Sequence, residues 1–416
     1  MVVIRKNENY FYFYDFENII TNGVIYFIVK RDINSNLWKY FVFILTSRRN
    51  YIPILSLYFL SLPNTAANQI GIYTGIAWLA GFFLEIPSGY LSDKFGHKKT
   101  LILAKFSIII STLLFSFGSS LYYFIFGSIF LSIGVAFISG TQGAFLHNTL
   151  IELKRSKEYA VLSGKMASKA SLVSVGMILA LPLLTKISLV MPIKAFLIFD
   201  VIGIFVAFSF YSPKIKFSAE DEEGERIWSQ LKRFKGSGFY TMSLFFGLIG
   251  SFLISLSPFK EVYVESLGIP IIFIGFIMAF SRVVWFVVGH NLKFLKKLKF
   301  KQLLFYEIFF FPILIIISSQ LKNPYIVGSI IAIILGYYHA RKPIIVEYYL
   351  NNFLINKRYK ATMISIKQQM AQLIQSVIAF LIGYVMVISF SLGFLVIGVF
   401  MLVLLLITYF FMRKYF

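Results

Sequence analysis

The chain has 416 residues, of which 58% are hydrophobic and 19% aromatic, and its 40 Lys and Arg outnumber 18 Asp and Glu, giving a formal charge of +22. The mean hydropathy of +0.78 excludes an ordinary soluble domain, in which about 45 to 50% of residues are apolar, and predicts a polytopic membrane protein. With no cysteine and four scattered histidines, disulfides and thiolate metal sites are excluded, so we expect neither a metal nor another cofactor.

A basic balance of this size can also indicate nucleic-acid binding. Here the basic residues lie in short segments between long apolar runs, and not on one soluble face. Orientation in a membrane explains that arrangement better, because Lys and Arg are retained on one side of a bilayer. We therefore reject nucleic acid as a partner and expect a lipid bilayer and a small-molecule substrate.

The first 36 residues mix charges with an apolar stretch from Ile19 to Val29. That stretch is too short to cross about 30 Å of hydrocarbon. It is not followed by the small-residue cleavage site of a signal peptide. We expect a cytoplasmic extension, or a start codon assigned too early with translation beginning near Leu37.

From Trp38 onward, apolar runs long enough to cross a bilayer follow one another with short gaps. Twelve are predicted, at residues 38–61, 68–91, 100–118, 121–150, 158–185, 189–211, 239–260, 269–289, 302–319, 324–348, 360–387 and 390–412. Sixteen basic residues of the short loops and the C-terminal end fall on one side, without counting the 212–238 segment, whereas the other side has only Lys186, Lys260 and Lys322. This asymmetry predicts an all-α, multi-pass protein of the cell (plasma) membrane with both termini in the cytoplasm.

A charged segment between Tyr211 and Gly238 divides the runs into two sets of six. Its acidic part is followed by a stretch whose apolar residues share one helical face: Ile227, Trp228, Leu231 and Phe234. We expect an amphipathic helix at the cytoplasmic surface, with a disordered linker as the alternative. The predicted organisation is an extension over 1–36, a six-helix half over 37–211, a linker over 212–238 and a second half over 239–416.

The segment between the second and third runs reads G-Y-L-S-D-K-F-G-H-K-K from Gly89 to Lys99. Gly96 supplies the positive φ that a tight reversal needs. Asp93 offers an anion to a nearby helix N-terminus, where the helix dipole favours it. A turn whose charges only set orientation is the simpler alternative. The candidate gating residues are Gly89, Asp93, Lys94, Gly96, Lys98 and Lys99.

This segment resembles the loop between helices 2 and 3 of the major facilitator superfamily, with His97 as its one clear departure. Ser139 to Leu150 and Arg341 to Ser365 resemble an efflux-type branch of the same family, although the acids of that branch near helix 4 are absent. Together the matches extend from about residue 37 to the end of the chain. The resemblance implies twelve helices in two six-helix halves and transport by alternating access.

Polar residues inside the predicted spans are costly in hydrocarbon and need a partner or a cavity. Arg48 and Arg49 lie about 16 Å into the first run at 1.5 Å per residue, at a depth that matches Asp200 in the sixth. Since successive residues point about 100° apart, one arginine is expected to pair with Asp200 and the other to face a central cavity. A purely structural ion pair is the alternative.

Other polar residues of the spans complete the set of candidates. Glu85 is a candidate proton carrier or an acceptor of hydrogen bonds between helices. Arg282 and Glu307 fall at similar depth and are expected to form a structural pair. Glutamines of the eleventh run form a stripe that faces a cavity or bonds to a neighbouring helix. The candidates for transport or coupling are Arg48, Arg49, Glu85, Asp200, Arg282, Glu307, Arg341, Gln368 and Gln372.

Together these features predict a monomeric secondary transporter and not an enzyme. No nucleotide-binding loop of the Gly-Lys-Ser type occurs, which argues against direct use of ATP. Export of a lipophilic or amphipathic compound, coupled to an ion such as the proton, is the first hypothesis, and uptake of a small metabolite by symport is the second. A lipid-carrier flippase or a membrane enzyme is the alternative from another class, although an enzyme should show acids or histidines clustered at one membrane face.

Overall fold

A computed structural model of the chain describes residues 5–7, 10–13, 27–30, 32–214, 238–292, 297–352 and 360–413. The helices of its first part are α1 (Asn36–Ser47), α2 (Ile52–Leu60), α3 (Ala67–Phe95), α4 (His97–Phe117), α5 (Leu121–Glu152), α6 (Tyr159–Ala180) and α7 (Met191–Ser209). Those of the second part are α9 (Phe239–Ser266), α10 (Ile271–His290), α12 (Phe300–Gln320), α13 (Pro324–Ala340), α14 (Lys342–Asn352), α15 (Lys360–Ile388) and α16 (Phe390–Met412). Short 3-10 helices are η1 (Ile33–Ser35), η2 (Ser156–Glu158) and η3 (Leu181–Lys186).

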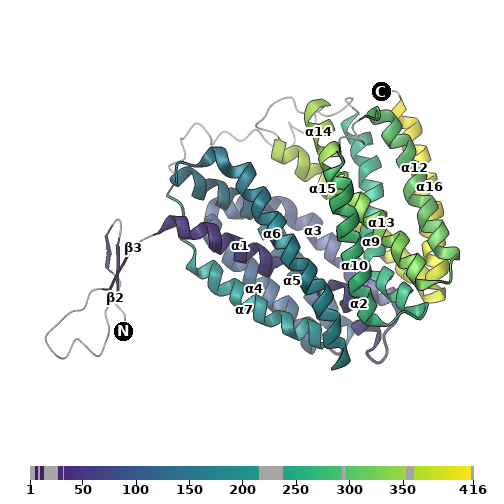
Figure 1. Ribbon diagram of the computed structural model, residues 1–416, viewed down its shortest axis with the longest axis horizontal. Coiled ribbons are helices and arrows are strands. Elements are labelled where there is room, and N and C mark those ends of the chain that lie inside the picture. Colours follow the sequence, from purple (N-terminus) through teal and green to yellow (C-terminus); the bar gives the residue numbers. More distant parts are fainter. Residues whose placement is uncertain are drawn as a thin grey trace.

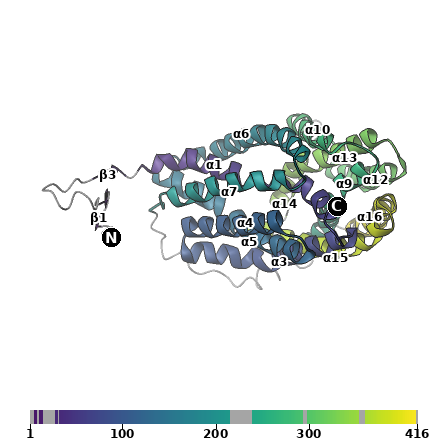
Figure 2. The ribbon, with the colours of Figure 1, turned by 90° about the horizontal axis from the view of Figure 1, so that it is seen from below.

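The helices form two bundles, which we call the N-half (α1 to α7) and the C-half (α9 to α16). The bundles meet at one end and diverge toward the end where the C-terminus lies (Figure 1). At the meeting end α3 lies beside α15, and α6 lies beside α10, as the view from below confirms (Figure 2). These two helix pairs, one on each flank, join the halves.

The described helices account for the predicted spans. Ten of them, some with a short continuation, are long and apolar enough to cross a membrane by themselves. The two remaining predicted spans, 38–61 and 68–91, correspond to the pair α1 and α2 and to α3, which has 29 residues. The predicted all-α membrane fold is confirmed. We call the side where α1 begins and α16 ends the termini side.

A proline interrupts the first span. Pro53 lies in the first turn of α2, and its ring excludes the helical hydrogen bond and the space that the carbonyl of Arg49 would need in a continuous helix. α1 accordingly ends at Ser47, and Arg48 has an extended backbone with φ −79° and ψ 125°. The break sets the directions of both arginines independently of helical periodicity.

One predicted boundary is wrong, and the error affects the charge count. The seventh span was expected to end at residue 260, which placed Lys260 among the basic residues of the outer loops. Helix α9 instead continues to Ser266 and buries Lys260 beside Glu261, with a nitrogen–oxygen distance of 2.6 Å. Burial is possible because each charge is neutralised by its neighbour.

Three short antiparallel strands precede the helices, in the order β1 (Arg5–Asn7), β2 (Tyr10–Phe13) and β3 (Phe27–Lys30). They fall in the segment that was expected to be an extension, and their aromatic and β-branched residues favour strands. The expected amphipathic helix around 227–234 lies outside the described residues.

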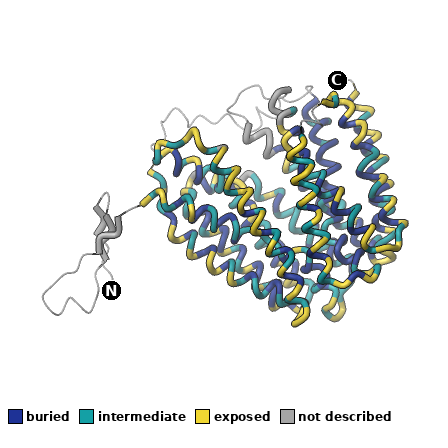
Figure 3. The backbone as a smooth tube through the Cα atoms, viewed as in Figure 1, coloured by how far each residue is buried: buried dark blue, intermediate teal, exposed yellow. Residues whose placement is uncertain are grey.

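The burial pattern is that of a protein in hydrocarbon. Large apolar side chains are exposed along the helices, for example Phe205, Phe286 and Phe410, each more than two-thirds exposed. Exposed positions recur along the helices that form the outside of the molecule (Figure 3). Soluble proteins rarely expose apolar patches of that extent, whereas lipid covers them at no cost. The polar and charged side chains of the spans point inward, and they form the sites described below.

Candidate functional site

The N-half and C-half are in close contact on the side opposite the termini. In α3, a Cβ added to Gly71 would lie 2.3 Å from the carbonyl oxygen of Ala379 in α15, so only glycine permits this approach. Gly383 faces Gly71 from α15. Further along α3, Gln369 Nε2 donates to the carbonyl oxygen of Phe82 at 3.2 Å. The contact between α3 and α15 thus extends from that side to about the level of Phe82.

On the other flank, α6 and α10 approach one another in the same way. A Cβ on Gly275 of α10 would lie 2.6 Å from the carbonyl oxygen of Ile178 in α6. Gly164 lies about 21 Å nearer the termini side along α6, at 1.5 Å per residue, and has open space where its Cβ would be. The helices of the two halves therefore separate toward the termini side.

Arg49 is the arginine that pairs with Asp200. Its Nη1 lies 2.7 Å from Oδ1 of Asp200, and the two side chains are 5% and 0% exposed. The second carboxylate oxygen accepts a hydrogen bond from Thr112 at 2.6 Å. Arg49 also donates through Nη2 to the carbonyl of Thr46, which has lost its helical donor at the break. The ion pair thus ties the end of α1 to α4 and α7.

A lysine that the sequence analysis did not select completes this network. Lys105 of α4 is fully buried and donates to Thr46 Oγ1 at 2.9 Å. Gly203 of α7 provides the space, because a Cβ there would lie 2.8 Å from Lys105 Nζ. A lysine five residues into an apolar run is a signal that a search for every charge inside the spans would have found.

Arg48 points away from this network. Its Nη2 makes a long hydrogen bond, of 3.4 Å, to the carbonyl oxygen of Ala167 in α6, and its Nε is buried without a hydrogen-bond partner. The two adjacent arginines therefore separate into a paired one and one directed at α6. This agrees with the expectation that only one of them pairs with Asp200.

The second buried ion pair joins Glu307 of α12 to Arg341, at the end of α13. Arg341 Nη1 lies 3.1 Å from Glu307 Oε2, both side chains are 1% exposed, and Tyr337 donates to the other carboxylate oxygen at 3.1 Å. The predicted pair of Glu307 with Arg282 is wrong. Similar depth did not bring them together, because Arg282 lies on a different face of the C-half.

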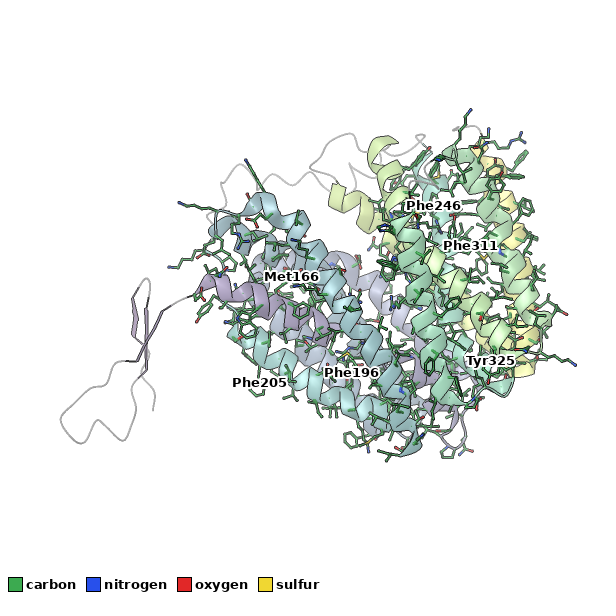
Figure 4. The ribbon with its side chains drawn as sticks, viewed as in Figure 1. Met166, Phe196, Phe205, Phe246, Phe311 and Tyr325 are labelled. Carbon is green, nitrogen blue, oxygen red and sulfur yellow. The ribbon has the colours of Figure 1, made fainter. Side chains whose placement is uncertain are left out.

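Aromatic rings enclose both buried pairs. In the N-half, the Arg49 guanidinium lies 5.0 Å from the ring centre of Phe196. In the C-half, Arg341 lies 5.7 Å from Phe246 and 5.2 Å from Phe311 (Figure 4). These cation–π contacts stabilise the desolvated guanidinium groups and support the interpretation of each pair as a structural element of its half.

Glu85 lies where the two halves meet. No ion pair of the described residues includes Glu85, whereas Asp200, Glu261 and Glu307 each have a cation within ion-pair distance. The Gln372 side chain of α15 lies against α3 one helical turn before Glu85, where a Cβ on Gly81 would be 3.3 Å from its Nε2, and it interacts with the Glu85 carboxyl group. The contact therefore crosses from the N-half to the C-half.

The glutamines of α15 divide by burial. Gln372 and Gln375 are almost fully buried, Gln369 binds α3, and Gln368 is exposed. Hydrogen bonding between helices accounts for Gln369, and the buried carbonyl oxygens of Gln372 and Gln375 have no hydrogen-bond donor. The candidates Gln368 and Gln372 thus occupy different surroundings.

The candidate gating residues lie at the end of α3 and the start of α4, on the termini side. Gly96 has φ 88° and separates the two helices, as its predicted role requires. Ser92 and His97 Nδ1 are 2.8 Å apart across the turn. Lys94 and Lys99 are exposed, Lys98 is half-buried, and Gly89 is approached by Gly140 of α5. The side chain of Asp93 and its expected partners near Ala361 lie outside the described residues.

A surface ion pair provides a contrast to the buried ones. Arg155 and Glu158, in the loop between α5 and α6, lie 2.8 Å apart with 38% and 47% of their side chains exposed. The hydrogen bond from Arg155 lowers the pKa of Glu158. Because exposed pairs contribute little, this pair supplies control substitutions for the buried charges.

Comparisons with known proteins agree on the fold. The family model described as Major Facilitator Superfamily matches residues 38–340. An uncharacterised transporter of Buchnera aphidicola subsp. Acyrthosiphon pisum (strain APS) is 34% identical over 116 residues, which cover only 28% of this chain and 29% of that relative.

Two solved structures superpose on most of the chain. The nucleoside transporter NupG has a TM-score of 0.74 at 12% identity, covering 93% of this chain and 100% of that one. A bacterial homologue of the human lysosomal transporter Spinster, in an inward-facing and unoccupied conformation, has a TM-score of 0.65 at 16% identity, with coverages of 93% and 98%. Identities this low show a shared fold alone.

Proposed function

Because this chain belongs to the Major Facilitator Superfamily and is a secondary transporter, not an enzyme, we propose that it exports an amphipathic or lipophilic compound by proton-coupled alternating access. The observation that carries the proposal is the position of Glu85. This acid lies in a membrane span, contacts the opposite half through Gln372, and has no cation partner among the described residues. A carboxyl group there changes its charge at the interface whose opening and closing constitute transport.

The geometry of the halves supports alternating access. α3 and α15, and likewise α6 and α10, are in contact on the side opposite the termini and separate toward the termini side. Reversing this pattern would open the opposite side. Protonation of Glu85 would remove a negative charge from the contact with α15, so it is suited to bias that exchange.

Export is proposed on the resemblance of the segments around α5 and α13 to an efflux-type branch. Proton-coupled uptake of a small metabolite is the second candidate, since a protonated Glu85 would serve either direction. We further expect a monomer, with the termini side facing the cytoplasm.

The proposal is tested in proteoliposomes that contain the pH indicator pyranine. A panel of amphipathic compounds is added, and compound-dependent proton movement is recorded for the parent protein, for Glu85→Gln and for Glu158→Gln as a matched surface control. We expect movement for at least one compound, retained in Glu158→Gln and lost in Glu85→Gln, with compound exchange at zero proton gradient surviving in both. Full proton movement in Glu85→Gln would refute the role of Glu85, and accumulation only in right-side-out vesicles would establish uptake.

A further inference from the structure

Two of the four arginines in the described spans have no carboxylate partner. Arg49 and Arg341 are neutralised by Asp200 and Glu307, whereas no carboxylate of the described residues lies within ion-pair distance of Arg48 or Arg282. An unneutralised guanidinium inside a membrane is costly and marks a cavity or a ligand pathway more often than a packing role. The structure therefore leaves two positive charges in the spans to be explained.

Both arginines lie on the surfaces where the N-half faces the C-half. Gly275 of α10 contacts Ile178 of α6, and Arg282 follows Gly275 by two helical turns, so it lies on the same face of α10, about 10 Å nearer the termini side. Ala167, which accepts the hydrogen bond of Arg48, precedes Ile178 by three turns, so it lies on the same face of α6 and about 16 Å nearer the termini side. Arg282 thus lies on the face of α10 that meets α6, and Arg48 contacts the face of α6 that meets α10, both nearer the termini side than the point where α6 and α10 touch.

The exposed residues of α10 fall on two sides of the helix. Its exposed residues Phe276, Phe280, Val283 and Val287 recur at helical spacing and form the lipid-facing side. At 100° per residue, Arg282 lies about 140° away from that side. Phe286, one helical turn after Arg282, is also exposed, so the side of α10 that carries Arg282 is not wholly covered by the N-half.

The two guanidinium groups repel each other, and few of their N–H donors have a described hydrogen-bond partner. The positive charge of Arg48 opposes that of Arg282. Arg48 has one long hydrogen bond and a buried Nε without a partner, and Arg282 has the ring of Trp285 at 5.3 Å as its described contact. The Trp285 ring in turn lies 5.4 Å from that of His339. Arg48, with a buried nitrogen that has no partner, and Arg282, stacked on a flat aromatic ring, form a complement to an organic anion.

We infer that Arg48 and Arg282 together bind the acidic group of an amphipathic substrate, a carboxylate, phosphate or sulfonate, while its apolar part lies against Trp285. The inference rests on the transport function proposed above and specifies its substrate class. Guanidinium groups suit this task because their planar donors match the oxygens of such anions in pairs. Since the arginines come from different halves, a bound anion removes their repulsion and favours approach of the halves on the termini side.

Equilibrium binding to the full-length protein in neutral detergent tests the inference without requiring transport. The probes are 2-naphthoate, 2-naphthyl phosphate and naphthalene-2-sulfonate, with neutral 2-naphthamide and cationic 2-naphthylmethylammonium of the same shape. Thermal unfolding midpoints are measured against probe concentration for the parent, Arg48→Gln, Arg282→Gln and the surface control Arg155→Gln. Arg48→Lys and Arg282→Lys keep each positive charge but lose the paired planar donors of the guanidinium group. They are measured instead of any glutamine variant that does not fold.

We expect at least one anion to stabilise the parent and Arg155→Gln in a saturable way, and the neutral and cationic probes to have no effect. Each of the two interface variants, Arg48→Gln and Arg282→Gln, should weaken anion binding at least tenfold. Equal binding of the neutral probe, or unchanged anion binding in both interface variants, overturns the inference. If phosphatidylglycerol stabilises the protein and none of the three anions can displace it, the site binds a lipid headgroup, and the inference is also overturned. If compounds still drive proton movement but the probes bind equally well with or without an anionic group, this inference alone is wrong. If the anionic probes bind as expected but no compound drives proton movement, only the proposed function is wrong.

Discussion

At the scale of single residues, the Asp200 carboxylate is the charge on which the N-half depends. It is fully buried, lies 2.7 Å from Arg49 and accepts a hydrogen bond from Thr112, while Lys105 adds a second cation nearby. Asp200→Ala leaves two buried cations without a carboxylate and should destabilise the protein by roughly 3 to 5 kcal/mol, as breaking a buried pair does. The measurement is the yield of folded monomer in detergent and its thermal unfolding midpoint.

A double variant separates the loss of the pair from the loss of one partner. Arg49→Met with Asp200→Leu removes both charges and should recover most of the lost stability, because replacing a buried pair by apolar groups is often neutral or stabilising. Arg155→Gln, which breaks an exposed pair, should leave the midpoint unchanged. If Asp200→Ala alone unfolded at the parental temperature, the pair would not be a structural element.

At the scale of helices, the contact between α3 and α15 is the element that closes the side opposite the termini. A side chain at Gly71 would collide with backbone atoms of Ala379 and Gly383, which cannot move aside as a flexible side chain could. Gly71→Leu should therefore shift the population away from the described conformation. Since the chain has no cysteine, a single Gly164→Cys can report this shift through its reaction rate with a soluble maleimide.

The direction of that change follows from the packing at Gly164, which has open space on its Cβ side. We expect the labelling rate of Gly164→Cys to fall at least threefold when Gly71→Leu is added, because separating the halves on one side brings them together on the other. Gly176→Leu is the matched control, since Gly176 also has open space at its Cβ. Equal effects of the two leucines would show that the close contact does not control the opening.

At the scale of the whole molecule, orientation is set by the basic residues between the spans. The burial of Lys260 within α9 leaves Lys186 and Lys322 as the basic residues counted on the side opposite the termini, which strengthens the predicted asymmetry. Reporter fusions after Lys99, Lys157 and Lys301 should therefore report the cytoplasm. Fusions near Asn64, Ser119 and Lys322 should report the exterior, and an external signal at Lys301 would contradict the twelve-span arrangement.

The sequence by itself determined the membrane class, the all-α fold, most of the spans and the reversal at Gly96. Each of these depends on a local property, since about 20 apolar residues suffice to define a span and a glycine suffices for a positive φ. The charge imbalance between the first and sixth spans, with two adjacent arginines in one and a single acid at matching depth in the other, also predicted that only one arginine pairs with Asp200.

Only the tertiary structure decided which charges meet. Pro53 breaks the first span, so helical periodicity could not tell that Arg49 turns to Asp200 and Arg48 to α6. Depth along the helices predicted that Glu307 pairs with Arg282. The partner depends instead on which face of the helix carries the charge and on which helix lies beside that face, and in the structure Glu307 pairs with Arg341. Pairing across a bundle depends on how helices rotate and pack against one another, and that information is distributed over the whole chain.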